Sequence, residues 1–403
     1  MTGTTVDPNV ISEINQNVAG LEPEGAYRVL AKASELEERG EDIVHLEIGQ
    51  PDYPTFPNIT LAGIRALAEG KTNYNPSQGI PQLREAIANQ VSETREVSAT
   101  PGEVAVGPGA KPMLFLSTVA MLEEGDEVMY PDPGFPTYKS MIEVAGGEPV
   151  PVPLIEDEGF RLNLDRLESS VTPKTKCILI NSPGNPAGNL ISPDSLERIA
   201  KLAREKDVFV LSDEIYSRMV YGEYDHRSIM NYGGMKERTI MVDGFSKTYS
   251  MTGWRLGFAV TPEPLAEKLG YLLTHSVGCT ATFTQYAGIE ALEGPQDRVE
   301  KNREVLRRKR DLVVERLNDI DGITCKTPRG AFYAFPKVDS FGPTSSELAD
   351  YLLEEAGVAL LPGTAFGSGG EGYLRVCYAN SLARLKEGIS RLDEALSGLK
   401  KEG

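Results

Sequence analysis

The strongest constraint on the fold is a series of short apolar segments that alternate with amphipathic stretches between about Val104 and Val260. Three of these segments, Cys177–Ile180, Val208–Leu211 and Ile240–Val242, are apolar at every position. Strands covered on both faces have this composition, because neither face meets water. Strands that alternate with helices predict an α/β fold, with a large domain whose mostly parallel sheet is flanked by helices.

The stretch between the first two apolar segments carries helix signals. Ser192 can cap a helix, and Pro193 follows at the first helical position, where a missing N–H costs nothing. Apolar residues then recur at i, i+3, i+4 and i+7, namely Leu196, Ile199, Ala200 and Ala203. A second, longer helix pattern follows Gly294-Pro295 and contains the basic run Arg307–Arg310. We interpret that run as a solvated helix face rather than an RNA-binding patch, because acidic residues surround it.

The charge of the chain limits its partners. With 59 acidic and 41 basic side chains, its formal net charge is −18. Such a surface repels phosphate backbones, so we expect no nucleic acid and no anionic membrane as the main partner. Any anionic ligand must be held by a few locally placed cations. No apolar run approaches the ~20 residues that span a bilayer, and Met1–Gln16 shows no export signal.

Cysteines and histidines are few and scattered. The four cysteines are Cys177, Cys279, Cys325 and Cys377, and the three histidines are His45, His226 and His275. The cysteines form no CxxC pair, so they are typical of reduced residues in a cytoplasmic protein rather than of disulfides or a zinc site. We therefore expect no metal site, and neither a nucleophile elbow nor a Walker A motif is present.

Polar residues follow each of the three apolar segments. They are Asn181–Gly188 (NSPGNPAG), Ser212–Tyr216 (SDEIY), and Asp243–Thr248 (DGFSKT) with Met251–Arg255 (MTGWR) close behind. In open α/β sheets, ligands bind beyond the carboxyl ends of the strands. The three segments therefore predict one polar site of mixed charge.

These motifs, in this order and spacing, resemble those of the pyridoxal-phosphate-dependent aminotransferases of class I and II, the aspartate-aminotransferase-like superfamily of fold type I. The resemblance runs from about Val29 to Leu396. It also includes Ile48–Asp52, Asn73-Tyr74, Leu83–Ile87, Gly330–Pro336, Leu361–Gly363 and Tyr373–Val376. It implies a large cofactor-binding domain over residues 51–294, and a smaller α+β domain formed by residues 1–50 together with residues 295–403.

The resemblance assigns three residues to the cofactor ring. Lys247 would form the internal aldimine with pyridoxal 5'-phosphate and would later move the substrate α-proton. Asp213 would keep the ring nitrogen protonated, which makes the ring an electron sink. Tyr216 would donate to the 3-oxygen of the ring, toward which Asn185 also converges. From the residues alone, Lys247 could be a solvated loop lysine and Asp213 could simply cap the next helix.

The cofactor phosphate requires an anion cradle. The segment Gly107–Lys111, which includes Gly109, Ala110 and Lys111, precedes a helix signal that begins near Pro112, and free backbone N–H groups at a helix start bind phosphate. The resemblance places Ser246 and Arg255 on the same phosphate. Two aromatic residues complete the implied cofactor site, namely Phe135, which would stack on the ring, and Tyr74, which would reach the phosphate of a neighbouring subunit. Core packing is the alternative for Phe135. Tyr74 implies a homodimer with shared active sites.

The substrate side of the implied site contains Arg375, whose guanidinium would bind the substrate α-carboxylate in a bidentate manner. The backbone of Gly49 and the side chain of Asn185 would assist. The segment Leu21–Tyr27 departs from the Ser-Ala-Thr type run of aspartate-preferring relatives. Preference for a dicarboxylic amino acid is therefore not assigned, and Tyr27 either lines the side-chain pocket or simply packs.

The resulting prediction is a cytoplasmic aminotransferase that moves an amino group between an L-amino acid and a 2-oxo acid by a ping-pong mechanism. A pyridoxal-phosphate-dependent lyase or decarboxylase shares these motifs and remains the alternative. The non-catalytic sensor domain of a transcription regulator is disfavoured, because only a short segment precedes Val29.

Overall fold

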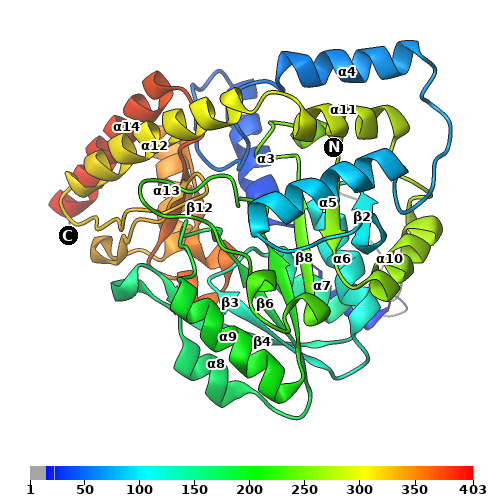
Figure 1. Cartoon of the computed structure of the whole chain (residues 1–403). Helices are drawn as coiled ribbons and strands as arrows, with labels where there is room; N and C mark the ends of the chain where they lie inside the picture. The colour runs from blue at the N-terminus through cyan, green and yellow to red at the C-terminus, as the bar shows by residue number, and fades with distance from the viewer. Residues whose placement is uncertain (1–14, 22, 403) are drawn as a thin grey trace.

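The computed structural model describes residues 15–21 and 23–402 (Figure 1). Most of Met1–Gln16, where the sequence predicts no export signal, lies outside these residues, as does Glu22. An eight-stranded sheet forms the centre, in the order β2 (Val104–Gly107), β9 (Gly257–Val260), β8 (Thr239–Gly244), β7 (Phe209–Asp213), β6 (Thr175–Asn181), β3 (Glu127–Asp132), β4 (Glu148–Ile155) and β5 (Arg161–Leu162). Strands β8, β7, β6, β3 and β4 run parallel to one another, whereas β9 and β5 pair antiparallel with their neighbours.

Side chains on these strands alternate between the two faces of the sheet, and each face is covered by helices. On β7, Val210 packs in the cluster under α8 (Leu164–Ser170) and α9 (Pro193–Lys206), while its neighbour Leu211 packs on the opposite side. That opposite side is covered by α6 (Ala110–Met121), α7 (Thr137–Val144) and α10 (Glu263–Ser276). Helices α5 (Pro81–Arg95) and α11 (Thr282–Glu293) cover the β2 end of the first face, and α4 (Pro57–Ala68) lies on α11.

A smaller part is built from both ends of the described chain. It contains two short sheets, in which β1 (Val44–His45) pairs with β11 (Val358–Ala359), and β10 (Tyr333–Ala334) and β12 (Leu361–Pro362) flank β13 (Leu374–Cys377). Its helices are α3 (Gly25–Glu38), α12 (Asp297–Asn318), α13 (Ser345–Ala356) and α14 (Leu382–Glu402), and Figure 1 shows α12 leading from α11 to a position beside α14. The short helix α2 (Gln16–Ala19) instead contacts α7 of the large part. One apolar core joins Val44 and Leu46 to the C-terminal elements.

Several local predictions are confirmed. The three apolar segments are β6, β7 and β8, and α9 begins at Pro193 with the Ser192 hydroxyl accepting from the Ser195 N–H. Arg307 and Arg308 pair with Glu304 on the surface of α12, as expected of a solvated face. Lys309 departs from the prediction, because it is buried and pairs with Asp52 at 2.6 Å. The strand predicted over Gly330–Pro336 is reduced to Tyr333–Ala334. Within the described residues, no helix is both long and apolar enough to cross a membrane.

Candidate active site

A cavity of about 640 Å³ lies beyond the carboxyl ends of the central strands. Eleven of the residues predicted for the site line it, namely Gly49, Ala110, Lys111, Phe135, Asn185, Asp213, Tyr216, Ser246, Lys247, Arg255 and Arg375. Tyr27 lines the same cavity. The residues come from β1, α6, α7, β6, β7, β8 and β13 or from the loops beside them, so the fold brings together parts of the chain that are far apart in sequence.

Lys247 follows the end of β8 and projects into the cavity, where its Nζ donates to the Gly49 carbonyl oxygen at 2.6 Å. No carboxylate pairs with this amine in the described chain, and burial lowers the pKa of Lys247 to about 8. The positive charges of Arg375, Lys111 and Arg255 push the pKa in the same direction. A lysine of this kind is a good nucleophile near neutral pH, because a sizeable fraction of it is uncharged.

Asp213 is the last residue of β7 and is almost completely buried. The Tyr138 hydroxyl donates to its Oδ2 at 2.7 Å, and the Ile215 N–H donates to its Oδ1 at 3.2 Å. Burial nevertheless raises the pKa of Asp213 to about 6. Asp213 lines the cavity and no ion pair to it is present among the described residues, so a cationic ligand group would remove the cost of burying its charge.

Asn185 and Tyr216 are held by hydrogen bonds that leave little freedom. The Asn181 side chain bridges two strand ends, since its amide donates to the Asp213 carbonyl at 3.0 Å and its oxygen accepts from the Asn185 N–H at 2.9 Å. The Tyr216 hydroxyl lies 2.7 Å from the Tyr333 hydroxyl. Polar atoms from β6, β7 and the C-terminal part are thus fixed against one another before any ligand arrives.

The start of α6 lies at the wall of the cavity. The N–H groups of Ala110 and Lys111 lie in the first turn, where a helix has no internal acceptors for them. Gly109, the preceding residue, has a φ of 110°, and a Cβ there would collide with the Arg255 guanidinium. Gly109 itself does not line the cavity. Ser246 and Arg255 do, so hydroxyl, guanidinium and backbone donors meet at one place.

Arg375 is buried in the wall of the cavity, on β13. Its guanidinium lies 4.4 Å from the centre of the Tyr333 ring, donates to Asn185 Oδ1 at 3.2 Å, and donates to the Glu47 carbonyl. Its Nε has no partner although it is buried. A buried guanidinium without a carboxylate partner is expensive unless a ligand supplies one.

Glu24, a residue near the N-terminus, also lines the cavity. Glu24, just before α3, forms an ion pair with Lys111 and accepts from the Thr137 hydroxyl at 3.0 Å. The Lys111 amine also lies 5.1 Å from the centre of the Phe135 ring. Phe135 packs edge-on against Tyr138 while it lines the cavity, so it serves both as a packing residue and as part of the cavity wall.

Tyr74 is the one predicted site residue that lies far from any buried environment. It is 96% exposed and does not line the cavity. Tyr74 therefore contributes nothing to the cavity of a single chain.

Several lining residues were not assigned to the site from the sequence, among them Glu24, Tyr138, Asn181 and Tyr333. Tyr138 lies three residues after Phe135, and Asn181 opens the NSPGNPAG segment, so proximity to predicted residues was the available signal. Tyr333 lies within the Gly330–Pro336 motif, where its hydroxyl excludes any side chain at Gly49.

Comparison with known proteins agrees with this geometry. The family model described as aminotransferase class I and II matches residues 41–392. A probable aspartate/prephenate aminotransferase of Aquifex aeolicus is 43% identical over 94% of this chain and 97% of its own length. An aromatic-amino-acid aminotransferase of Thermococcus litoralis is 40% identical over 91% of this chain and 95% of its own length.

A solved structure extends the match to three dimensions. The aspartate aminotransferase of Thermus thermophilus with maleate has a TM-score of 0.91 and 37% sequence identity, and the match covers 95% of this chain and 99% of that one. A family match over most of the chain, together with relatives of this similarity, leaves no other assignment: the chain is an aminotransferase and belongs to the class I and II aminotransferases of fold type I.

Proposed function

We propose that this aminotransferase holds pyridoxal 5'-phosphate in the cavity described above and exchanges amino groups between an L-amino acid and a 2-oxo acid by a ping-pong mechanism. One observation carries the proposal. Lys247 and Asp213 line the same cavity, and each is held there without a partner of opposite charge in the described chain. The family uses this cofactor, and an aldehyde with a basic ring nitrogen would engage both residues.

The chemistry of the other lining groups fits the cofactor. Its phosphate would fit the hydrogen-bond donors of Ala110, Ser246 and Arg255. A Cβ on Gly109 would collide with the Arg255 guanidinium, so glycine at this position leaves the guanidinium room. The ring oxygen of the cofactor matches the Tyr216 hydroxyl and the Asn185 amide. When bound, the cofactor would supply an electron sink that stabilises negative charge on the substrate α-carbon.

Lys247 would both anchor the cofactor and move a proton. Its amine, with a pKa lowered to about 8, can accept the proton of the substrate α-carbon at Nζ. The same amine would give that proton up again as the amino group moves to the cofactor. The Gly49 carbonyl, 2.6 Å from Nζ, orients the amine. Asp213 would hold the ring nitrogen in its charged form, and Tyr138 would hold Asp213.

Arg375 would bind the substrate α-carboxylate. The guanidinium is fixed on two sides by Asn185 and the Glu47 carbonyl, and its remaining donors face a cavity that also contains Lys247. Because a planar guanidinium matches a carboxylate with two parallel hydrogen bonds, Arg375 would orient the α-carbon as well as retain the substrate.

Arg375→Lys is therefore expected to raise the KM for the amino acid by about 10²-fold while kcat falls less. A lysine keeps the charge but loses the bidentate geometry. Steady-state kinetics with the best amino donor would measure both constants. An unchanged KM would remove Arg375 from the proposed role.

The distal end of the substrate would meet a mixed wall of Tyr27, Leu30, Phe135 and the Glu24–Lys111 ion pair. While Glu24 neutralises Lys111, the wall offers little net positive charge to a second carboxylate. Amino acids with apolar or aromatic side chains are therefore the proposed preferred class, and dicarboxylic ones would have to displace Glu24.

Glu24→Gln tests this proposal. Removing the carboxylate leaves Lys111 free, so kcat/KM for aspartate or glutamate is expected to rise by about 10-fold relative to that for phenylalanine. Glu35→Gln, on the next turns of α3, is a matched control that leaves the wall intact. An equal change for both substrate classes would contradict the proposed role of Glu24.

We also propose a homodimer with shared active sites. Tyr74 is almost fully exposed, and α4 presents Leu61, Ile64 and Leu67 to solvent at 59%, 56% and 47% exposure. An exposed apolar row on a helix next to an exposed aromatic residue fits an interface between two copies of the chain.

Hybrid dimers test the sharing. Tyr74→Ala and Lys247→Ala chains, mixed and refolded together, are expected to regain activity that neither has alone, because one of the two hybrid sites then has both residues intact. Mixing Lys247→Ala with Asp213→Asn chains is the control, since both residues belong to one chain's cavity and no intact site can form. Recovery in the control, or none in the test, would contradict the shared site.

The reaction itself is tested with excess enzyme loaded with cofactor and a panel of L-amino acids, in the absence of any 2-oxo acid. An aminotransferase should bleach the visible absorption once, release one equivalent of 2-oxo acid and recover when a 2-oxo acid is added. Continuous product formation without a 2-oxo acid would favour the lyase or decarboxylase alternative.

Two further expectations accompany the proposal. The four free cysteines, Cys177, Cys279, Cys325 and Cys377, suit a reducing compartment, so we propose a cytoplasmic location. We also propose the division into a large domain over 51–294 and a smaller one formed by 1–50 with 295–403, supported by the pairing of β1 with β11.

A further inference from the structure

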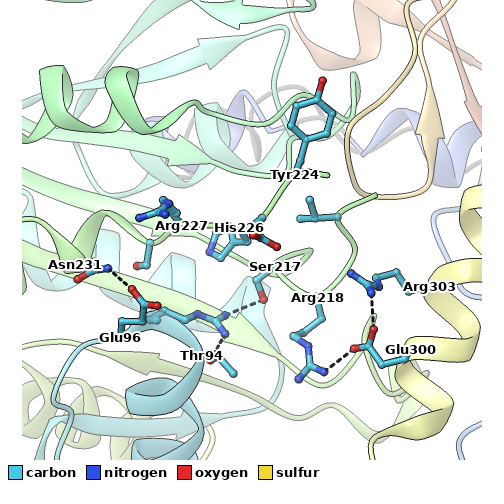
Figure 2. A pocket seen from close by; sticks show the side chains of 14 residues that line it. Thr94, Glu96, Ser217, Arg218, Tyr224, His226, Arg227, Asn231, Glu300 and Arg303 are labelled. Carbon is cyan, nitrogen blue, oxygen red and sulfur yellow. Dashed lines mark hydrogen bonds and ion pairs between the residues drawn. The ribbon is translucent and has the colours of Figure 1, made fainter. Parts of the chain in front are cut away.

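A second cavity, of about 340 Å³, lies between the end of α5, the loop that follows β7, and α12 (Figure 2). It shares no lining residue with the cavity of Lys247. Nothing in the proposed reaction uses it, although its floor is formed by residues that follow directly on the strands carrying the catalytic groups.

The floor is a buried, fixed ion-pair network. Arg95, at the end of α5, donates to Glu214 at 3.1 Å, to Asp243 at 2.5 Å and to the Ser217 hydroxyl at 2.8 Å. The Ser228 hydroxyl donates to Glu214 at 2.6 Å. Every member is held by at least one partner, so the floor is rigid, but the single positive charge of Arg95 faces the two carboxylates of Glu214 and Asp243.

His226 belongs to this network but leaves one of its two ring nitrogens without a partner. Its side chain is 7% exposed, and its Nε2 lies 3.0 Å from Glu214 Oε2. Its Nδ1 has no partner although it is buried, and the residue lines the cavity. A buried polar atom without a partner costs free energy that a ligand in the cavity could recover.

Three arginines on the walls keep unused donors. Arg218 and Arg303 both pair with Glu300, at 3.2 and 2.6 Å, and each engages it through a single nitrogen (Figure 2). Arg227 makes no hydrogen bond or ion pair within the described part of the chain. In a protein with a net charge of −18, this is a local concentration of guanidinium groups.

Besides Glu300, two more acidic side chains line the cavity and limit its affinity for anions. Glu96 accepts from Asn231 at 3.2 Å, and Asp225 is exposed on the same loop as His226. A singly charged ligand would gain little against these carboxylates, whereas one with several anionic oxygens can engage more than one guanidinium at once.

We propose that this cavity is a second binding site, specific for a small polyanion that bears phosphate or carboxylate groups. Arg227, with Arg218 and Arg303, would bind the anionic oxygens. His226, as an imidazolium whose Nε2–H donates to Glu214, would add a hydrogen bond from its Nδ1–H at the floor. Guanidinium groups suit both kinds of oxygen, so phosphate and carboxylate are separate arms of the test.

The test uses the holoenzyme labelled with ¹⁵N-histidine, titrated with inorganic phosphate in one arm and with tricarballylate in the other. Only three histidines are present, and His226→Gln assigns its resonance. Saturable movement of the His226 signal, with His45 and His275 unmoved, is expected in at least one arm. Binding at the catalytic cavity alone would leave His226 unmoved in both arms, and this result would overturn the proposal.

Arg227→Gln should weaken the responding ligand by about tenfold in the same titration, because a charge-assisted hydrogen bond is lost. The fold should tolerate this change, since Arg227 is exposed and has no partner to leave unpaired. Arg316→Gln, an exposed arginine of α12 outside the cavity, is the matched control and should bind like the wild type. Equal affinities for all three proteins would also overturn the proposal.

Discussion

Lys247→Ala is expected to abolish the visible absorption of bound cofactor and to lower kcat by about 10⁴-fold. The substitution removes the lysine amine that lies in the cavity and donates to the Gly49 carbonyl. Lys111, the other lysine lining the cavity, is paired with Glu24 and cannot substitute for it. Absorption spectra of the protein with added cofactor, and single-turnover rates with an amino donor, would measure both effects.

The fold should survive this substitution. The Lys247 side chain makes one hydrogen bond and no ion pair within the described chain, and burial disfavours its charged form. Thermal melting of the cofactor-free proteins should therefore give similar midpoints. Lys201→Ala, on the exposed face of α9, controls for the loss of a lysine. Turnover retained by Lys247→Ala would remove the proposed mechanism.

The central sheet was predictable because its signals are local. The continuous apolar composition of β6, β7 and β8 follows from burial on both faces, and the Ser192-Pro193 start of α9 follows from capping. The polar residues after these strands could be grouped into one site, since parallel strands end at the same edge. The residues Asn185, Asp213 and Lys247 do line one cavity.

The partners of these residues could not be predicted in the same way. Tyr138 is a helical residue that reaches Asp213 across 75 positions, and Glu24 reaches Lys111 across 87. Neither position carries a local signal, because a tyrosine in an amphipathic helix and a glutamate before a helix are ordinary choices. Tertiary packing alone decides these contacts.

Strand length in the C-terminal part was also beyond sequence reasoning. The apolar run of Gly330–Pro336 suggests a full strand, yet only Tyr333 and Ala334 pair in a ladder. The side chains of Phe332 and Tyr333 are instead packed against Tyr216, and the backbone of Ala331, two residues before the strand, has a φ of 57°, so the extended conformation begins late. Aromatic residues that serve the site therefore interrupt the regular structure.

Asp213→Asn is the second substitution with a large expected effect. An amide cannot hold a ring nitrogen in its charged form, so kcat should fall by about 10²–10³-fold, while cofactor binding weakens less. Asn can still accept the Tyr138 hydroxyl and keep the local geometry. Tyr138→Phe removes only the hydrogen bond to Asp213 and should have a smaller effect on kcat.

The same substitution should stabilise the cofactor-free protein. The pKa of Asp213 is raised from 3.8 to about 6 in the folded state, because burial disfavours the charged carboxylate. The folded protein therefore binds more protons than the unfolded chain between pH 3.8 and about 6, and stability falls as the pH rises through this window. Above it, the wild type bears a cost of about 3 kcal/mol that an amide avoids.

Urea unfolding of cofactor-free Asp213→Asn and wild type, from pH 4 to pH 8, would measure this difference. The variant should be the more stable protein at pH 8, and the difference should shrink as the pH falls below about 6. Asp165→Asn, at an exposed carboxylate, should show no such dependence. A wild type as stable as the variant at pH 8 would mean that Asp213 is already compensated in the free protein. The proposal that Asp213 needs a positively charged ring nitrogen as its partner would then have no physical basis.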